Sequence, residues 1–322
     1  MHINLATFNI FWYGSSAVDK NPRTDDDQKR IAQVLTRLDA DVFVFQEILD
    51  LGGLETLLRG IAGHTYELHR SDDAWLTSAD PPSKSKMKIV SAYDANVLEL
   101  VAAAPLRNPV VDPEYKGRRD PYAMHLRVRA TGEEFTLVGV HLKSGLPNAG
   151  QGDRDAEIRL RETTFLASWL AGTLDVKLEP FERPPTEDVI VMGDCNATES
   201  NFSVAPLLDG RHYQPCQVAT SLDPAAPLLL DDPGEQWSTF LDRAVIDHVI
   251  VSLMVRPKIS SALIYAFDSD PALDEEPAGG GHWLRKTTDY RVEPYENAGV
   301  RPVPNLYRIS DHRPVQITME TA

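Results

Sequence analysis

The chain has 322 residues, of which 42% are hydrophobic and 25% are charged, a composition typical of a soluble globular protein. Its formal net charge of −16 argues against broad electrostatic capture of nucleic acid, which normally uses stripes of lysine and arginine. The charge does not exclude an enzyme that acts on phosphate at a local site, particularly one that brings in a cation.

The number of cysteines and the length of the apolar segments indicate where in the cell the protein is located. The two cysteines, Cys195 and Cys216, are too few for a disulfide framework and suggest a reducing compartment. No apolar run approaches the length of a membrane span, so we expect none. No basic region followed by an apolar core precedes the first apparent strand, so no signal peptide is visible. A cytoplasmic location is favoured, although a secreted protein with its leader removed would read the same.

The first part of the chain predicts strands that alternate with helices. Polar side chains end both strands, with Asn9 at the first and the pair Gln46 and Glu47 at the second. The helices are predicted from apolar residues at helical spacing, the first preceded by acidic residues. In order, we predict a strand at 3–10, a helix at 25–38, a strand at 42–47 and a helix at 54–61.

The middle of the chain predicts two hairpins. Strands at 89–93 and 96–101 are joined by a tight turn, and strands at 122–130 and 134–141 by a turn at Thr131 and Gly132. The polar stretch before them, residues 71–88, is expected to be a loop. The longest helix is predicted at 154–174.

The stretch DVIVMGDCNA, residues 188–197, contains four apolar residues that run directly into Gly193 and Asp194. Such a run predicts a strand buried on both faces, and Gly193 permits a turn at its end. Burying an unpaired charge is costly, so we expect Asp194 to meet a metal, a cation or a substrate group. The alternative is that Asp194 and Asn196 cap the next element.

The last part of the chain predicts further strands around one long excursion. In order, we predict a short helix at 204–208, strands at 244–252 and 262–267, and a closing segment at 307–319. Residues 268–304 are rich in proline, glycine and charge and are interpreted as a surface insertion. Helices that cover antiparallel hairpins in both halves predict two sheets packed face to face, in one domain over residues 1–322.

Polar residues recur where the predicted strands end or are interrupted. They are Asn9, Glu47, His141, Asp194, Asn196, Asp247, Asp311 and His312. Each has a structural explanation by itself, as a turn residue, an ion-pair partner or a satisfied histidine, but eight independent coincidences are a poor explanation. The hard oxygen ligands among them suit Mg²⁺ or Mn²⁺. Motifs for zinc, for a serine nucleophile and for nucleotide cradles are absent, so the set fits metal-assisted hydrolysis of a phosphate ester.

Seven segments carry a family resemblance, and they occur in the family's order. They are TFNI (7–10), FQE (45–47), RDP (119–121), VHLKSG (140–145), GDCN (193–196), IDHV (246–249) and SDHRP (310–314). The chain resembles the endonuclease/exonuclease/phosphatase superfamily, which has the fold of deoxyribonuclease I, and looks closest to bacterial deoxyribonuclease-type members. The resemblance implies an α/β (α+β) fold, a four-layer α/β/β/α sandwich of two mainly antiparallel sheets with the active site at one edge.

The resemblance also implies a metal site and a general base. Glu47 and Asn9 would hold Mg²⁺ or Mn²⁺, and Asp311 would support the ion directly or through water. Asp247 would orient His312 as the base toward the attacking water. A histidine titrates near neutral pH, as a base should, and a solvated aspartate does not.

Five further residues receive roles in binding the phosphate. The resemblance implies that Asn196 and Asp194 position the phosphate and the water, and some accounts of the family make the aspartate the base. His141 would donate to a non-bridging oxygen. Arg119 would reach a phosphate or tether its loop, and Lys143 would contact the substrate.

One departure concerns the orientation of His141. Deoxyribonuclease-like members carry a glutamate in the hairpin before the VHLKSG strand, but residues 85–90 read SKMKIV without a carboxylate. We therefore expect another group to orient His141.

The substrate is not decided by fold alone. The leading expectation is a monomeric nuclease acting on DNA or RNA; the alternatives are a phosphatase or phosphodiesterase of small or lipid phosphates, and a non-catalytic binding module. Several side chains would follow a phosphate backbone or stack on a base in a nuclease, and would be solvated or loop-pinning otherwise: Lys84, Lys86, Lys88, Arg118, Trp283 and Tyr290.

Overall fold

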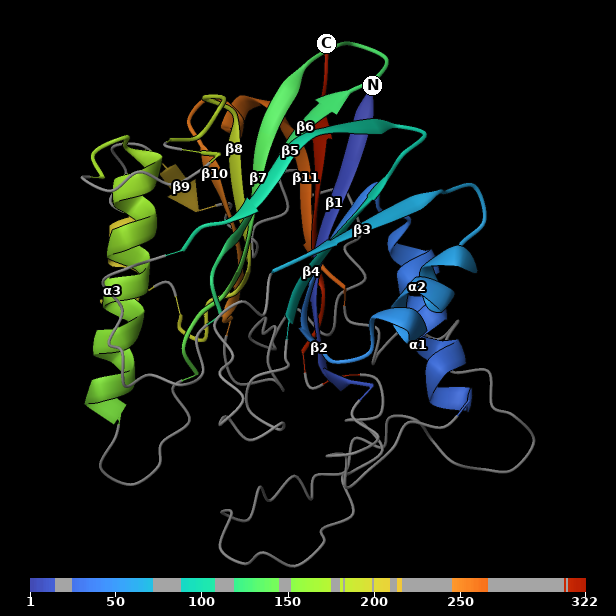
Figure 1. Ribbon diagram of the computed structural model, residues 1–322, viewed down its shortest axis with the longest axis horizontal. Coiled ribbons are helices and arrows are strands. Elements are labelled where there is room, and N and C mark those ends of the chain that lie inside the picture. Colours follow the sequence, from blue (N-terminus) through green and yellow to red (C-terminus); the bar gives the residue numbers. More distant parts are fainter. Residues whose placement is uncertain are drawn as a thin grey trace, which may run out of the picture.

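Two six-stranded sheets pack face to face, with helices on the outer face of each (Figure 1). The computed structural model describes residues 1–14, 25–71, 88–107, 119–144, 152–174, 180–181, 183–198, 200–208, 213–215, 245–265, 310 and 312–322. Most of the predicted loop at 71–88, the predicted insertion at 268–304 and Cys216 lie outside these residues.

The strands follow a mainly antiparallel order in both sheets. The first sheet holds, from edge to edge, β11 (Ile259–Ile264), β12 (Val315–Glu320), β1 (His2–Tyr13), β2 (Val42–Ile48), β4 (Lys88–Asp94) and β3 (Tyr66–Arg70). The second holds β5 (Leu98–Pro105), β6 (Tyr122–Val128), β7 (Glu134–His141), β8 (Val189–Asp194), β10 (Asp247–Ser252) and β9 (Tyr213–Pro215). The pairs β1–β2 and β7–β8 are parallel.

The described helices are α1 (Asp25–Leu38), α2 (Leu51–Arg59), α3 (Gly152–Leu170) and α4 (Ala205–Leu208), with a 3₁₀ turn at Arg256–Lys258. In Figure 1, α1 and α2 lie on one side of the paired sheets and α3 on the other. None of the helices in the described ranges is long and apolar enough to cross a membrane.

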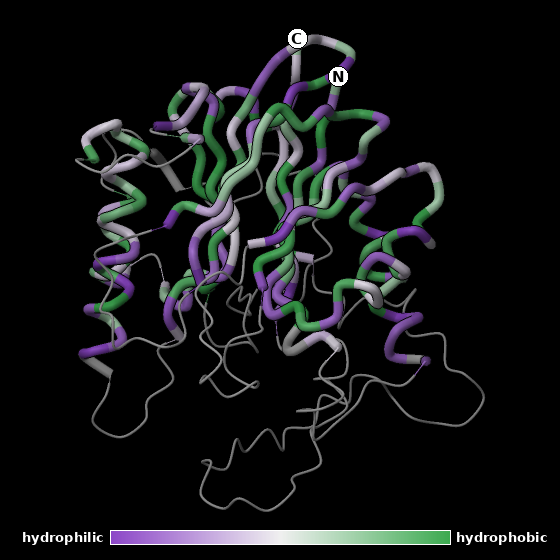
Figure 2. The backbone as a smooth tube through the Cα atoms, in the orientation of Figure 1, coloured by the Kyte–Doolittle hydropathy of each residue, from purple (hydrophilic) through white to green (hydrophobic). Residues whose placement is uncertain are grey.

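Side chains of successive strand residues divide between three cores. In β1, Ile3 and Leu5 face the core between the sheets, whereas Ala6 and Phe8 pack in the core that includes α1 and α2. The third core joins the second sheet to α3 through Trp169. Figure 2 shows hydrophobic residues running along the strands of both sheets. This is the four-layer sandwich that the resemblance implied.

One predicted hairpin is wrong. The strands expected at 89–93 and 96–101 correspond to β4 and β5, but these lie in different sheets. Both edges of β4 are occupied, by β2 and β3, so β5 cannot pair with it. The intervening turn instead carries the chain from one sheet to the other. Strand β3 was missed in the sequence, as was the short strand β9.

Candidate active site

The ends of strands from both sheets meet at one edge of the sandwich. In the second sheet, His141 and Asp194 are partners in the parallel register of β7 and β8, and Asp247 pairs with Asp194 from β10. In the first sheet, Asn9 is at the same level as Gln46. Asn9 Nδ2 donates to Asp194 Oδ2 at 3.0 Å, which joins the two sheets directly.

Gly193 fixes the position of Asp194 by allowing close contact between neighbouring strands. Its φ is +146°, and a Cβ at this position would lie 2.0 Å from the carbonyl oxygen of Val140. Glycine is therefore required inside β8 by the approach of the β7 backbone, whereas the sequence suggested only that it permits a turn.

Glu47 has a backbone conformation that is rare for a residue with a side chain. Its φ is +62°, and it lies where the pairing of β2 with both β1 and β4 shifts register. A bulge of this kind changes the direction of a side chain relative to a regular strand. Glu47 Oε1 is 3.4 Å from Asn9 Nδ2 and 3.8 Å from His141 Nε2. The strained backbone thus accompanies a carboxylate that faces the site.

Asp194 lies at the centre of the group. Its Oδ2 is 3.5 Å from His141 Nε2 and 3.9 Å from His312 Nε2, and its Oδ1 accepts a hydrogen bond from the Asn196 amide at 2.7 Å. Burial raises the pKa of Asp194; His312 and the Asn196 amide oppose this shift, and the charges of Asp247 and Glu47 add to it.

His312 is held by a carboxylate and a serine. Its Nδ1 is 2.8 Å from Asp247 Oδ2, and its backbone amide donates to Ser310 Oγ at 3.0 Å. Ser310 Oγ in turn donates to the Asn9 carbonyl at 2.5 Å. Sequence reasoning missed this role of Ser310, although the residue is part of the SDHRP motif.

Arg119 contacts the ring of His141. Its Nη1 is 2.6 Å from Nδ1 and also contacts Nε2, and its Nη2 donates to the Leu142 carbonyl at 3.4 Å. A guanidinium can only donate, so the ring nitrogen that accepts from Arg119 must be the one that carries no proton. Burial, together with the charges of Arg119 and His312, lowers the pKa of His141 well below its usual value. In this protein the His141 ring is contacted by Arg119, and residues 85–90 contain no glutamate of the kind that deoxyribonuclease-like members carry.

The Lys143 side chain points to α3, whereas the Asn196 side chain points to the end of β7. The Lys143 ammonium is 3.3 Å from Asp155 Oδ1 of α3 and donates to the Ser144 carbonyl at 2.9 Å. Its substrate contact stays a prediction. Asn196, with φ of +51°, donates through Nδ2 to the Leu142 carbonyl at 3.0 Å, so its side chain braces the end of β7.

The remaining predicted residues are placed as follows. Asp311 lies outside the described residues, as do Lys84, Lys86, Arg118, Trp283 and Tyr290. Lys88 is buried at the start of β4. Cys195 is buried, and burial raises the pKa of its thiol well above the usual value, so the thiol remains protonated.

The donor set fits a hard divalent cation. Asp194, Asp247 and His312 each offer an atom within 4.8 Å of the others, and all three are buried. Glu47 adds a further carboxylate beside Asp194. Carboxylates packed this closely repel one another, and a cation would relieve that repulsion. Carboxylate oxygens such as those of Glu47 and Asp194 are the ligands that Mg²⁺ and Mn²⁺ take, whereas an imidazole nitrogen such as that of His312 suits softer metals.

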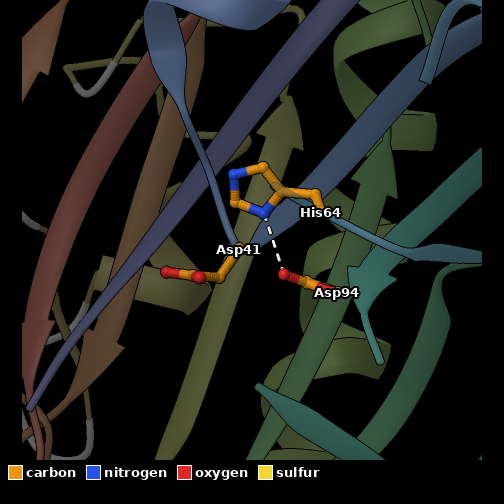
Figure 3. A group of neighbouring side chains, drawn as sticks. All are labelled: Asp41, His64 and Asp94. Atoms are coloured by element: carbon orange, nitrogen blue, oxygen red, sulfur yellow. Dashed lines mark hydrogen bonds and ion pairs between the residues drawn. The ribbon is translucent and has the colours of Figure 1, made fainter. Parts of the chain in front are cut away.

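A second group, Asp41, His64 and Asp94, lies at the other end of β2 and is drawn in Figure 3. His64 Nδ1 is 2.9 Å from Asp94 Oδ2, and His64 Nε2 is 2.9 Å from Asp39 Oδ1. A protonated imidazole therefore satisfies both carboxylates. Burial lowers the pKa of His64, but hydrogen bonds and charges of Asp39 and Asp94 outweigh it and leave the pKa raised. We interpret this group as structural.

The geometry agrees with a comparison against protein families. The model of the endonuclease/exonuclease/phosphatase family matches residues 6–312. The chain belongs to this family. A comparison with curated protein sequences found no match.

Several solved structures share the fold. The catalytic domain of human Nocturnin aligns with a TM-score of 0.58 at 15% identity, covering 99% of this chain and 94% of that one. A humanized TDP2 from D. rerio gives a TM-score of 0.57 at 12% identity, covering 99% of both chains. A mannosyl-6-phosphatase from Bacteroides thetaiotaomicron gives 0.55 at 15% identity, covering 98% of both.

Proposed function

We propose that this protein is a divalent-metal-dependent phosphodiester hydrolase, and that it is a nuclease. The observation that carries the proposal is the meeting of Asn9, Glu47, His141, Asp194 and the Asp247–His312 pair at one edge of two sheets. These residues supply an oxygen-rich metal site, a histidine held by a carboxylate and a second histidine beside an arginine.

The metal would be held by Glu47 and by the amide oxygen of Asn9, with support from Asp311 as the resemblance implies. The two side chains are neighbours, with 3.4 Å between Asn9 Nδ2 and Glu47 Oε1, and the Asn9 amide would have to turn over to present its oxygen to the ion. When bound, a divalent ion supplies positive charge that stabilises the phosphate and the leaving oxygen.

His312 is assigned as the general base. Asp247 accepts from Nδ1, which leaves Nε2 with the lone pair that takes a proton from the attacking water. A solvated aspartate is a poor base because its pKa is far below neutral pH, but Asp194 is buried, so this argument does not exclude Asp194 as the base. Both oxygens of Asp194 nevertheless accept hydrogen bonds, from Asn196 and Asn9, so we assign it to positioning the water.

His141 and Arg119 are assigned to the phosphate. Arg119 carries a permanent positive charge, and His141 with its lowered pKa is a neutral imidazole that has one N–H to donate. Directed donors at a site where negative charge develops stabilise the pentavalent state more than the ground state.

The substrate assignment draws on the fold neighbours and on the charge. A D. rerio TDP2 complexed with a single-strand DNA product aligns with a TM-score of 0.56 at 12% identity, which supports a nucleic acid substrate. The second candidate, a phosphatase or phosphodiesterase of small or lipid phosphates, is favoured by the net charge of −16 and by the likeness to the mannosyl-6-phosphatase.

A substrate screen separates the candidates. The protein would be incubated with plasmid DNA, single-stranded DNA, RNA, bis-p-nitrophenyl phosphate and inositol phosphates, with Mg²⁺ or Mn²⁺. We expect cleavage of nucleic acid, lost on chelation and in Asp194→Ala. Turnover of the small phosphates alone would favour the second candidate. No turnover, together with no Mg²⁺ binding by calorimetry, would favour a non-catalytic binding module.

A further inference from the structure

Two charged side chains of α3 hold the peptide groups of one residue, Lys143. Its backbone amide donates to Glu162 Oε2 at 2.9 Å, and its carbonyl accepts from Arg159 Nη1 at 2.9 Å. Arg159 and Glu162 are three residues apart and therefore lie on the same face of the helix. Lys143 lies two residues beyond His141, the last residue of β7.

This arrangement buries charge. The relative exposure is 5% for Arg159 and 8% for Glu162. Burial lowers the pKa of Arg159 and raises the pKa of Glu162 to about 7. Burying charged groups is costly unless they are hydrogen-bonded. The hydrogen bonds that Arg159 and Glu162 make to the Lys143 peptide compensate for their burial.

The adjoining peptide is where the active-site residues connect. The Leu142 carbonyl accepts from Asn196 Nδ2 at 3.0 Å and from Arg119 Nη2 at 3.4 Å. The Leu142 amide donates to the Asp194 carbonyl at 2.9 Å. A displacement of the Leu142–Lys143 backbone would thus move Arg119, Asn196 and the His141 ring together.

Arg159 also holds the loop that follows β8. Its Nε donates to Ser203 Oγ at 3.2 Å, and the neighbouring Thr163 Oγ1 donates to the Ser203 carbonyl at 2.6 Å. One face of α3 therefore joins the segment after His141 to the segment after Asn196.

We propose that Arg159 and Glu162 are positioning residues of the active site, which fix the Lys143 peptide and through it the phosphate-binding side chains Arg119 and His141, together with the neighbouring Asn196. The proposal rests on the proposed function, because that function assigns Arg119 and His141 to the substrate phosphate. Neither residue of α3 touches the substrate.

Two substitutions at position 162 separate hydrogen-bond reach from charge. Glu162→Gln keeps the length and an acceptor oxygen, whereas Glu162→Asp keeps the charge but withdraws the oxygen by one methylene. We expect Glu162→Gln to retain kcat within about three-fold and Glu162→Asp to lower it about ten-fold or more, since small misplacements at a site reduce rates strongly. KM and urea unfolding would be measured for each variant.

Arg159→Lys provides a second variant. A lysine cannot donate in the two fixed directions that reach Lys143 and Ser203, so we expect a fall in kcat of about ten-fold. The matched controls are Glu157→Asp and Arg161→Lys, which lie on the exposed face of the same helix and should leave kcat unchanged. If Glu162→Asp does not fold, Arg159→Lys decides the question.

Hydrogen exchange gives a readout that does not depend on activity. We expect exchange in the segments 141–144 and 194–198 to become about ten-fold faster in Glu162→Asp and to stay unchanged in Glu157→Asp. Unchanged exchange, or a folded Glu162→Asp with kcat within about two-fold of the wild type, overturns the positioning role. A ten-fold loss of kcat in Glu162→Gln also overturns it, because the charge of Glu162 and not the position of its acceptor oxygen would then control the rate. Wild-type protein without phosphoesterase activity would refute the proposed function separately.

Discussion

Replacing Gly193 by alanine tests how the end of β8 is built. The new Cβ would lie 2.0 Å from the Val140 carbonyl oxygen and 2.9 Å from its carbonyl carbon. Non-bonded heavy atoms need about 3.5 Å, so about 1.5 Å of overlap must be absorbed. The obstacle is the backbone of β7, which cannot rotate away as a side chain can.

The expected cost has two parts. A φ of +146° is strained for any residue with a Cβ, which costs about 1–3 kcal/mol. Overpacking against β7 adds about 1–3 kcal/mol. The free energy of unfolding should therefore fall by about 2–6 kcal/mol, a large share of the total stability of a typical protein.

Urea unfolding followed by tryptophan fluorescence measures this loss, since Trp169 is fully buried in the core of the second sheet. Gly132→Ala is the matched control, because its φ is +77° but a Cβ there would meet nothing within 4 Å. Gly132→Ala should therefore lose stability only through backbone strain, without the steric overlap. If Gly193→Ala destabilises the protein no more than Gly132→Ala, the close approach of β7 and β8 is refuted.

Three further predictions concern individual side chains. Asp247→Asn removes the charge that holds His312 Nδ1 and should lower kcat by about 10²–10⁴-fold in steady-state assays, with Asp188→Asn as a control; an unchanged kcat would refute the assignment of the base. His64 has a raised pKa in the folded state, so its ion pairs stabilise the protein below the ordinary value of 6.5, and that contribution is lost as pH rises through the folded-state pKa. In urea unfolding, the wild type should therefore exceed His64→Gln in stability by more at about pH 5.5 than at about pH 8.5, and a gap that widens with pH would contradict this. Cys195→Ala should keep kcat within about three-fold, because the buried thiol is protonated and serves as a spacer; loss of turnover would assign it a chemical role.

The strands and the location of the site could be predicted because their signals are local. Apolar runs predicted β1, β2 and β8, and a polar residue at the end of each run marked Asn9, Glu47 and Asp194. Those residues lie at strand ends that meet at one edge, which the family resemblance also implied. In the structure, Asn9 donates a hydrogen bond to Asp194 across the two sheets.

The remaining features depend on contacts between distant parts of the chain. Nothing in the sequence around Asp94 shows that both edges of β4 are taken, so a hairpin was predicted where the chain changes sheets. Arg159 and Glu162 lie within the helix predicted at 154–174, and the sequence prediction assigned no role to either. Their spacing from Asp155 continues the buried face, and this was the signal that could have identified them.

The most direct test of the central claim is metal-dependent cleavage by the Asp247–His312 pair. Wild type and His312→Ala would be assayed on single-stranded DNA with Mg²⁺, after chelation, and after Mg²⁺ is restored. We expect wild-type cleavage that stops on chelation and returns with Mg²⁺, and a loss of about 10²-fold or more in His312→Ala. Cleavage that persists without metal, or that is unaffected in His312→Ala, would contradict the assignment of this site.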